Sequence, residues 1–217
     1  MKTPLLLTTL FVFAACNAPG VGPVAGAIGF DDGDVSAFTA GSTGSTGGRG
    51  PDATWAVVPD ADAVSPGRVL RLTGFDHVDE DRFNLFWTRG VRFGDARIAV
   101  AVRADAGAID QGGGPMWRVQ DADNYYLCRF NPLESNFRLY VVLGGRRHQL
   151  ATAKVEAGPG WHRLEAEHRG DRITCWFDGE LLLEAQDARL AGPGGIGVWT
   201  KADARTSFDE LLVQPKH

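Results

Sequence analysis

The chain contains few residues of several kinds: 3 cysteines, 2 methionines and 3 tyrosines among 217 residues. So few cysteines exclude a small domain held together by disulfide bonds. Basic residues are also in the minority, since 22 Lys and Arg face 27 Asp and Glu and give a formal net charge of −5. The longest basic run is Arg146-Arg147. Binding to nucleic acid, which needs a basic surface, is therefore not expected.

Glycine is abundant instead, with 28 residues, while hydrophobic residues make up 44% and charged residues 23% of the chain. An ordinary charged fraction combined with many strand-forming residues excludes a disordered, collagen-like or coiled-coil protein. A chain of this length can bury a core of its own. The composition therefore predicts one globular domain, and we expect it to be a monomer.

Residues 1–15 have the pattern of a secretory signal peptide, with a positive charge at Lys2 and a short apolar run over residues 5–15. The run is too short to span a bilayer. It ends in Phe13-Ala14-Ala15-Cys16, which resembles the lipobox of bacterial lipoproteins. The resemblance implies an exported protein of the bacterial cell envelope that is lipid-anchored at Cys16. Cleavage of an ordinary signal peptide beside an incidental Cys16 is the alternative.

Residues 16–29 are rich in Gly, Pro and Ala and are expected to form a flexible tether. The other two cysteines, Cys128 and Cys175, both lie in strand-like runs. They can pack as small apolar side chains, or they can form a disulfide in an exported protein. The sequence leaves both alternatives open.

From Phe30 onward, short apolar runs and period-two patterns alternate with Gly, Pro, Asn and Asp, which predicts an all-β domain over residues 30–214. About thirteen strands are too many for one open sheet, so two antiparallel sheets should pack face to face. The low-complexity segment 41–51 is expected to be a mobile loop, and residues 30–32 to be an edge strand near the last strand. The expected strands are 55–58, 68–72, 84–87, 96–103, 116–120, 124–130, 137–143, 148–154, 162–168, 172–177, 180–184, 195–200 and 207–213.

Several segments together resemble the concanavalin A-like jelly-roll domains of bacterial exported proteins. They are Asn84–Thr88, Gln111–Arg118, Asp121–Tyr126, Asn131–Asn136, Gly160–His162, Gly194–Asp203 and Ser207–Leu211. The similarity covers about residues 30–213 and is strongest to the laminin G-like group allied to the 3-keto-disaccharide hydrolase domain. It implies a two-sheet antiparallel jelly-roll sandwich.

The 3-keto-glycoside-cleaving members of that group usually end in a Gln-x-His and a Phe-Arg-Asn-Ile type of segment. Here the corresponding segments are Val198-Trp-Thr-Lys and Ser207-Phe-Asp-Glu-Leu. The carboxylate triplet of laminarinase-type glycosidases is also missing from the sequence. These departures favour a domain without catalytic activity.

Alternation along residues 124–131 places Tyr126, Cys128 and Phe130 on a core face, and Tyr125, Leu127, Arg129 and Asn131 on the opposite face. On a concave sheet, these polar side chains, with Arg138, would form a hydrogen-bonding floor, and Tyr125, Tyr140 or Trp199 would form an aromatic wall. Such a surface suits a sugar, because rings cover C–H groups while Arg and Asn bind hydroxyls. The predicted ligand-binding residues are Arg118, Gln120, Tyr125, Arg129, Asn131, Glu134 and Trp199. The alternative is that the arginines form structural ion pairs with Asp121, Glu134 and Asp203.

Asp121, Asp123 and Asn124 form a compact acidic segment that could hold Ca²⁺, which prefers six to eight oxygen ligands. A hairpin turn has the same composition, because Asp and Asn side chains cap their own backbone. The histidines show no spacing suited to zinc.

The sequence therefore predicts a non-catalytic module that binds a carbohydrate or glycan. Two alternatives stay open: a glycoside-cleaving enzyme of the 3-keto-disaccharide hydrolase type, and a structural or protein-interaction module of the cell envelope.

Overall fold

The computed structural model describes residues 27–28, 30–43, 53–65, 67–74 and 80–216. The expected signal peptide, Cys16 and most of the expected tether and loop lie outside the described residues. Within the described ranges, no helix is long and apolar enough to cross a membrane. The strands are β1 (Ala27–Ile28), β2 (Phe38–Thr43), β3 (Thr54–Asp60), β4 (Gly67–Gly74), β5 (Phe83–Thr88), β6 (Ala96–Ala106), β7 (Gly114–Asp121), β8 (Asn124–Asn131), β9 (Asn136–Leu143), β10 (Arg146–Lys154), β11 (Trp161–Arg169), β12 (Arg172–Phe177), β13 (Glu180–Gln186), β14 (Gly195–Lys201) and β15 (Arg205–Pro215).

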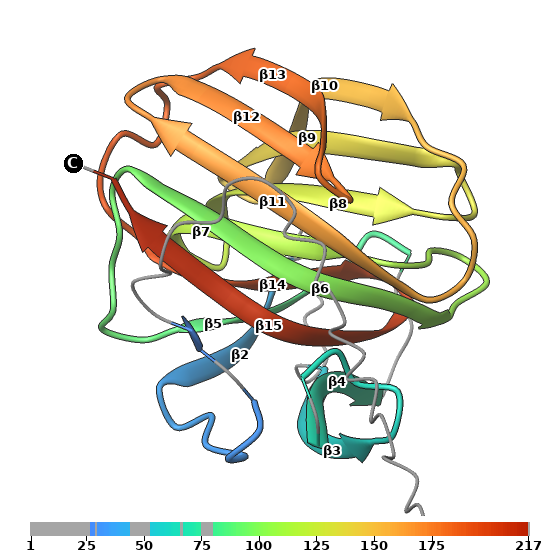
Figure 1. Cartoon of the computed structure of the whole chain (residues 1–217). Helices are drawn as coiled ribbons and strands as arrows, with labels where there is room; N and C mark the ends of the chain where they lie inside the picture. The colour runs from blue at the N-terminus through green and yellow to red at the C-terminus, as the bar shows by residue number, and fades with distance from the viewer. Residues whose placement is uncertain (1–26, 29, 44–52, 66, 75–79, 217) are drawn as a thin grey trace, which may run out of the picture.

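The strands form two antiparallel sheets that pack face to face (Figure 1). Sheet A has the order β13-β12-β11-β6-β15-β4-β3, with β1 paired to β15, and sheet B has the order β10-β9-β8-β7-β14-β5-β2. β15 is paired with β4 and β6 in the middle of sheet A, although its residues are the last described. This two-sheet antiparallel sandwich confirms the fold class expected from the sequence.

The space between the sheets holds the main core, to which both sheets contribute alternate side chains. From β8, Tyr126, Cys128 and Phe130 enter this core, as the period-two pattern predicts. Tyr125 and Leu127 point to the other face of sheet B and belong to a second buried cluster. Sheet B therefore carries apolar side chains on both of its faces.

All thirteen strands expected between residues 55 and 213 are present, but the edge strand expected at residues 30–32 is wrong, and β1 and β2 were not expected. Ala27 and Ile28 pair with Leu212 and Leu211, whereas residues 30–32, expected as the edge strand, form a bend and turn. Residues 41–43, expected as the start of a mobile loop, instead continue β2 along β5.

β2 was missed because its Ala, Gly, Ser and Thr residues have the composition of a loop. Gly41 is needed in the strand, because a Cβ there would lie 2.6 Å from the indole ring of Trp87 on the neighbouring β5. Small residues in β2 thus leave room for one large ring.

Cys128 of β8 and Cys175 of β12 enter the core from opposite sheets, and both are free and fully buried. Burial raises the pKa of the Cys128 thiol, and the neighbouring Cys175 adds to this effect. The structure therefore has the two cysteines as apolar packing residues, which is one of the two alternatives left open by the sequence.

Candidate functional site on the outer face of sheet B

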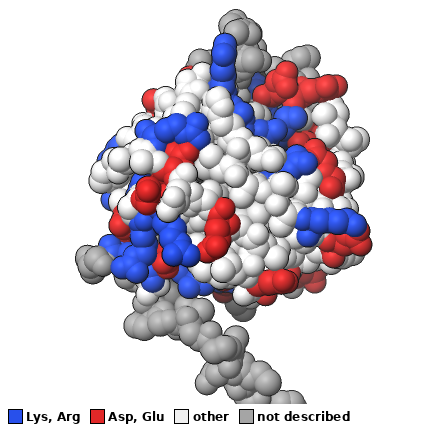
Figure 2. Space-filling model, turned by 90° about the horizontal axis from the view of Figure 1, so that it is seen from above, with Lys and Arg blue, Asp and Glu red and all other residues white. Residues whose placement is uncertain are grey.

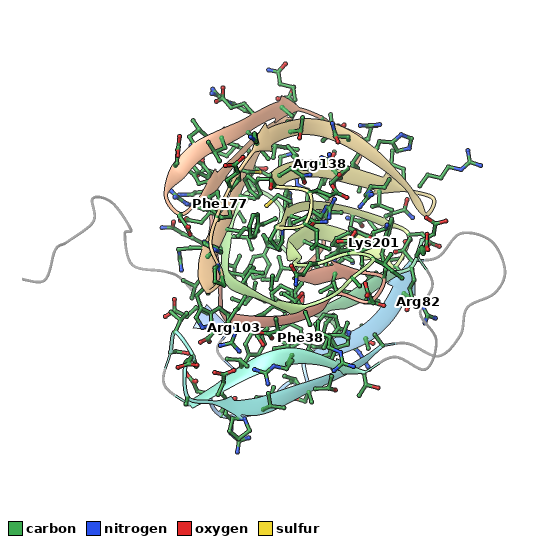
Figure 3. The ribbon with its side chains drawn as sticks, turned by 90° about the vertical axis from the view of Figure 1, so that its right-hand side faces the viewer. Phe38, Arg82, Arg103, Arg138, Phe177 and Lys201 are labelled. Carbon is green, nitrogen blue, oxygen red and sulfur yellow. The ribbon has the colours of Figure 1, made fainter. Side chains whose placement is uncertain are left out.

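The outer face of sheet B carries a group of charged side chains, which we call the charged cluster: Asp110, Arg129, Glu134, Arg138, Arg147 and Lys201. Arg129 comes from β8, Arg138 from β9, Arg147 from β10 and Lys201 from the end of β14. In Figure 3, Arg138 and Lys201 lie to the right of Phe177, which belongs to the core between the sheets. Antiparallel pairing places Arg138 opposite Arg129, so that both point to the same face.

Arg129 is the centre of the cluster, and only 1% of its side chain is exposed. Its Nη1 donates to Oδ1 of Asp110 at 3.0 Å, and its Nη2 donates to Oε2 of Glu134 at 2.9 Å. Asn131 donates to the same Asp110 oxygen at 3.1 Å, while Nζ of Lys201 lies 3.7 Å from Oδ2 of Asp110. The buried guanidinium of Arg129 thus links β8 to Asp110 in the β6–β7 connection and to Glu134 in the β8–β9 turn.

Glu134 is the most exposed carboxylate of the cluster, with 43% of its side chain accessible. Oε2 accepts hydrogen bonds from Arg129, Arg138 and Asn136, each at 2.9 Å. Oε1 accepts none from the described part of the chain. One oxygen thus fixes the carboxylate, and the other is free to accept a hydrogen bond from a ligand hydroxyl.

The two carboxylates differ in their electrostatics. Burial raises the pKa of Asp110, although Arg129 and Lys201 act against this effect. For Glu134, burial acts to raise the pKa, but the hydrogen bond from Asn136 and the charges of Arg129 and Arg138 outweigh it and lower the pKa. Glu134 is therefore held ionised, which suits it to accept hydrogen bonds and not to act as a general acid.

Arg147 lies over the rings of Tyr140, Phe83 and Trp199, with its guanidinium carbon 4.5, 5.1 and 5.7 Å from the three ring centroids. It makes no salt bridge with any described residue. Burial lowers its pKa, and the like charge of Arg129 adds to this effect. The aromatic rings hold this arginine in place by cation–π contacts, without neutralising it.

The cluster and the adjoining Asn136 contain buried polar atoms without a hydrogen-bond partner among the described residues: Arg129 Nε, Asn136 Oδ1, Arg138 Nε and Arg147 Nη1. Such atoms are costly unless water or a ligand reaches them. Their concentration around one group of charges indicates unused hydrogen-bonding capacity at this place.

The structure brings together three of the predicted ligand-binding residues: Arg129, Asn131 and Glu134. Tyr125 and Trp199 share their face of sheet B, but both are fully buried. Nε1 of Trp199 donates to the hydroxyl of Tyr125 at 3.2 Å. These two rings form an apolar base beneath the charges, not the exposed aromatic wall expected from the sequence.

Arg118 and Gln120 lie elsewhere, because a register shift in β7 interrupts the expected alternation. Arg118 has a φ of 47° and donates to the carbonyl oxygens of Gly170 and Leu190 and to the Asp95 carboxylate. Gln120 hydrogen-bonds to Arg92 at 2.6 Å. The left-handed residue directs Arg118 to the β11–β12 turn and, with Gln120, to the β13–β14 connection.

The acidic segment at residues 121–124 forms the β7–β8 hairpin turn. Oδ1 of Asp121 accepts hydrogen bonds from the Asp123 backbone N–H and the Asn124 side chain, each at 2.8 Å. Oδ1 of Asn124 accepts from Gly144 N–H at 3.0 Å. Among the described residues, no group of three His, Cys, Asp or Glu side chains is arranged to hold a metal ion. The contacts seen are those of the turn alternative.

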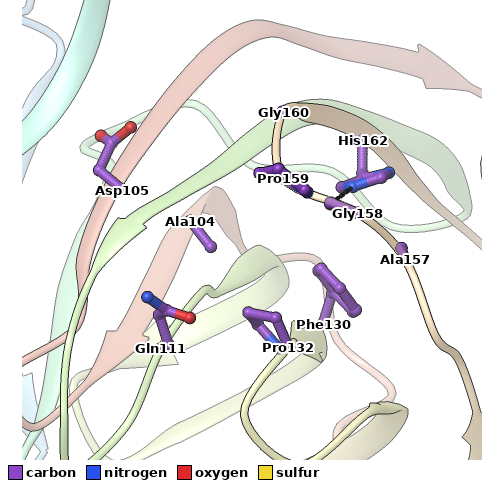
Figure 4. A pocket seen from close by; sticks show the side chains of 10 residues that line it. All are labelled: Ala104, Asp105, Gln111, Phe130, Pro132, Ala157, Gly158, Pro159, Gly160 and His162. Carbon is purple, nitrogen blue, oxygen red and sulfur yellow. Dashed lines mark hydrogen bonds between the residues drawn. The ribbon is translucent and has the colours of Figure 1, made fainter.

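A pocket of about 390 Å³ opens at one end of the sandwich, next to the β8–β9 turn (Figure 4). His162 lies in its wall with Nδ1 2.7 Å from Oδ2 of Asp178 and Nε2 2.9 Å from the carbonyl oxygen of Gly158. The ring also stacks on Phe177 at 5.0 Å. Because both ring nitrogens are engaged, His162 has a packing role and holds the pocket wall together.

Sequence reasoning missed three members of the charged cluster, Asp110, Arg147 and Lys201, and also Asn136, which donates to Glu134. Arg147 could have been found, because Gly144-Gly145 predicts a tight hairpin and pairing across it sets Arg147 opposite Val142, on the face of Tyr140. Asp110 and Lys201 carry no local signal, since they reach Arg129 only through the tertiary fold.

The sequence matches no protein-family model and no curated protein. Its structure is similar to the carbohydrate-binding module CBM66 from Bacillus subtilis, with a TM-score of 0.62 and 18% identity over 82% of this chain and 95% of the other. It is also similar to a Bacillus subtilis protein of unknown function with a galectin-like fold, with a TM-score of 0.58 and 12% identity over 89% and 96%. A third similar structure is domain 4 of AbnA, a GH43 extracellular arabinanase from Geobacillus stearothermophilus, in complex with arabinotriose, with a TM-score of 0.57 and 13% identity over 88% and 91%. At these identities the likenesses establish the fold, and the chain is a concanavalin A-like jelly-roll β-sandwich.

Proposed function

We propose that the chain is a monomeric carbohydrate-binding module whose ligand site is the charged cluster. The observation that carries the proposal is the state of Glu134: Oε2 is fixed by three donors, while Oε1 accepts no hydrogen bond from a described residue. A fixed carboxylate beside Arg138 can accept from one sugar hydroxyl while the arginine donates to the next. Similarity to CBM66 and to the arabinanase domain supports this proposal.

We also propose that the module has no catalytic activity. Glycoside hydrolysis needs one carboxyl group with a raised pKa as acid and a second as nucleophile or base. In the charged cluster, the pKa of the exposed Glu134 is lowered, and Asp110, whose pKa is raised, is only 4% exposed. The enzyme alternative predicts release of a reducing sugar or keto-sugar from a bound glycan, which a reducing-end assay would detect.

The proposal is tested by a glycan array with the wild-type chain, Glu134→Gln and the control Glu184→Gln. Glu184 pairs with Arg172 on sheet A and is 55% exposed, so the control removes the same charge far from the site. Wild type and control should bind the same glycans, and Glu134→Gln should bind about tenfold more weakly, because it loses a charge-assisted hydrogen bond. No binding by the wild type, or equal binding by Glu134→Gln, would overturn the proposal.

We further propose that the module is exported and anchored through a lipid on Cys16. Each acyl methylene buried in a membrane contributes about 0.8 kcal/mol, so two or three chains would hold the protein firmly. Cys16→Ser should be released from the membrane fraction of the producing cell, while the wild type stays bound. Membrane retention of the exported serine variant would contradict the anchor.

Calcium dependence at Asp121, Asp123 and Asn124 is a separate proposal, and the same array tests it. If Ca²⁺ contributes, binding falls when a chelator is added and returns with excess Ca²⁺. Unchanged binding in the presence of the chelator would contradict it.

A further inference from the structure

The charged cluster contains more positive than negative charge. Four cations, Arg129, Arg138, Arg147 and Lys201, surround two carboxylates, Asp110 and Glu134, which leaves an excess of two positive charges. The whole chain has the opposite sign, with a formal net charge of −5. Figure 2 shows a face on which blue and red side chains lie side by side, as ordinary surface pairing produces. The excess in the cluster is therefore a local feature.

Water can solvate this excess positive charge only in part, because the side chains that carry it are largely buried. The side chains of Arg129 and Lys201 are 1% and 18% exposed, and Arg138 is 31% exposed. Arg147 is half-buried against aromatic rings. Charge in such surroundings is screened less than at an open surface, and an unpaired buried charge is costly. An anion that enters the cluster removes this cost.

The arrangement of donors fits a carboxylate. Glu134 is an example of a carboxylate bound by this cluster, since its Oε2 accepts hydrogen bonds from both Arg129 and Arg138. Arginine side chains offer paired N–H donors in one plane, which matches the two oxygens of a carboxylate. Arg147 as a whole is half-buried and has no salt-bridge partner among the described residues; its buried Nη1 makes no hydrogen bond to them. It is the member of the cluster best placed to take a new carboxylate.

We propose that the charged cluster binds an acidic sugar. Arg147, which lies over the ring of Tyr140, donates hydrogen bonds to the carboxylate of a hexuronic acid residue, and Arg138, which contacts the hydroxyl of the same tyrosine, donates to a neighbouring group of the sugar. Oε1 of Glu134 accepts a hydrogen bond from a hydroxyl group of the same sugar. This inference rests on the proposed carbohydrate-binding function and narrows it to glycans that contain uronic acids.

The ligand test uses oligosaccharides of galacturonate, glucuronate and mannuronate, each paired with its methyl ester. The ester keeps the ring and its hydroxyls but removes the negative charge. At least one acid should bind about tenfold or more tightly than its ester, and the difference should shrink as salt rises from 50 to 500 mM, because salt screens the charge of the free carboxylate ligand and its attraction to the cluster. Titration calorimetry measures both affinities.

The protein test uses Arg147→Met, which keeps a long apolar side chain over the rings but removes the charge. The matched control is Arg172→Met, an arginine that is 66% exposed on sheet A and pairs with Glu184. Arg147→Met should lose about tenfold in affinity for the acid and little for the ester, whereas the control should lose neither. Thermal unfolding of both variants verifies that they fold, and Arg147→Lys should recover part of the affinity.

The possible results separate this inference from the proposed function. If neutral glycans or methyl esters bind as tightly as the acids, the module function stands and the inference is wrong. If sulfated glycans bind and uronates do not, the carboxylate assignment is wrong. If no glycan binds, the proposed function fails, and the inference fails with it.

Discussion

Replacing Arg129 by Met tests whether the buried charges of the cluster hold one another in place. The change preserves a long side chain but leaves Asp110, which is 4% exposed, without its main counter-charge. Breaking a buried pair by removing one partner costs about 3–5 kcal/mol. For a domain of this size each kcal/mol lowers the melting temperature by about 2–4 °C, so Arg129→Met should melt roughly 6–20 °C lower.

The second variant of the series is Arg129→Met with Asp110→Asn. It removes the orphaned carboxylate, so the double variant should recover at least half of the stability lost by Arg129→Met. Calorimetry on the wild type, both single variants and the double variant completes the cycle. The control Arg172→Met removes an exposed arginine and should cost less than about 1 kcal/mol.

The same reasoning fixes the sign of the pH dependence. The pKa of Asp110 is already raised by burial, and loss of Arg129 raises it further. An acid whose folded-state pKa is raised stabilises the folded form as the pH falls through that pKa. The deficit of Arg129→Met relative to wild type should therefore shrink as the pH falls below neutral. A loss below 1 kcal/mol, purely additive variants, or a deficit that grows as the pH falls would refute the reasoning.

Three further predictions concern the core. Burial, with the charge of Arg118, lowers the pKa of His168 from 6.5 to about 4, so the unfolded chain takes up a proton that the folded chain refuses. The free energy of unfolding should therefore fall by about 3 kcal/mol between pH 6.5 and pH 4. In His168→Gln the free energy of unfolding, measured by denaturation at each pH, should depend less on pH. An equal pH dependence in wild type and variant would contradict this. Gly114→Ala puts a Cβ 2.0 Å from the Cys128 carbonyl oxygen and should lower the free energy of unfolding by at least about 2 kcal/mol in urea denaturation. The control Gly94→Ala, whose Cβ would have its nearest atom at 3.9 Å, should lower it by less than about 0.5 kcal/mol. Equal losses in the two variants would contradict the packing. Cys128 and Cys175 should react with a thiol reagent only after denaturation, as peptide mass spectrometry reports, and a disulfide-linked peptide pair would contradict the free thiols.

The strands were predictable because most of them follow period two and end at Gly, Asn or Asp turns. Tyr126, Cys128 and Phe130 alternate with Tyr125, Leu127 and Arg129, and the two sets do lie on opposite faces. The failure at β2 has a physical cause, since Gly41 leaves room for the ring of Trp87, and Ser42 and Thr43 are buried although their composition is that of a loop. A pattern read along one strand does not reveal what its neighbour requires.

The site was predictable only in part, for a similar reason. Alternation correctly placed Arg129 and Asn131 on one face. In β7, however, the left-handed backbone of Arg118 breaks the alternation, and the residue types of this strand do not indicate such a break. Burial was the second gap: Trp199 is on the expected face, but it lies beneath Arg147 and is fully covered. Asp110 is separated from Arg129 by 19 positions, lies in the β6–β7 connection and meets Arg129 only in the folded protein.

The central claim is that a glycan binds at the charged cluster, and NMR chemical-shift mapping tests it most directly. The labelled protein is titrated with the tightest-binding glycan of the array. The largest shift changes should occur at Glu134, Arg138 and Arg147. Changes centred on sheet A around Trp176, or confined to the end pocket around His162, would contradict the account.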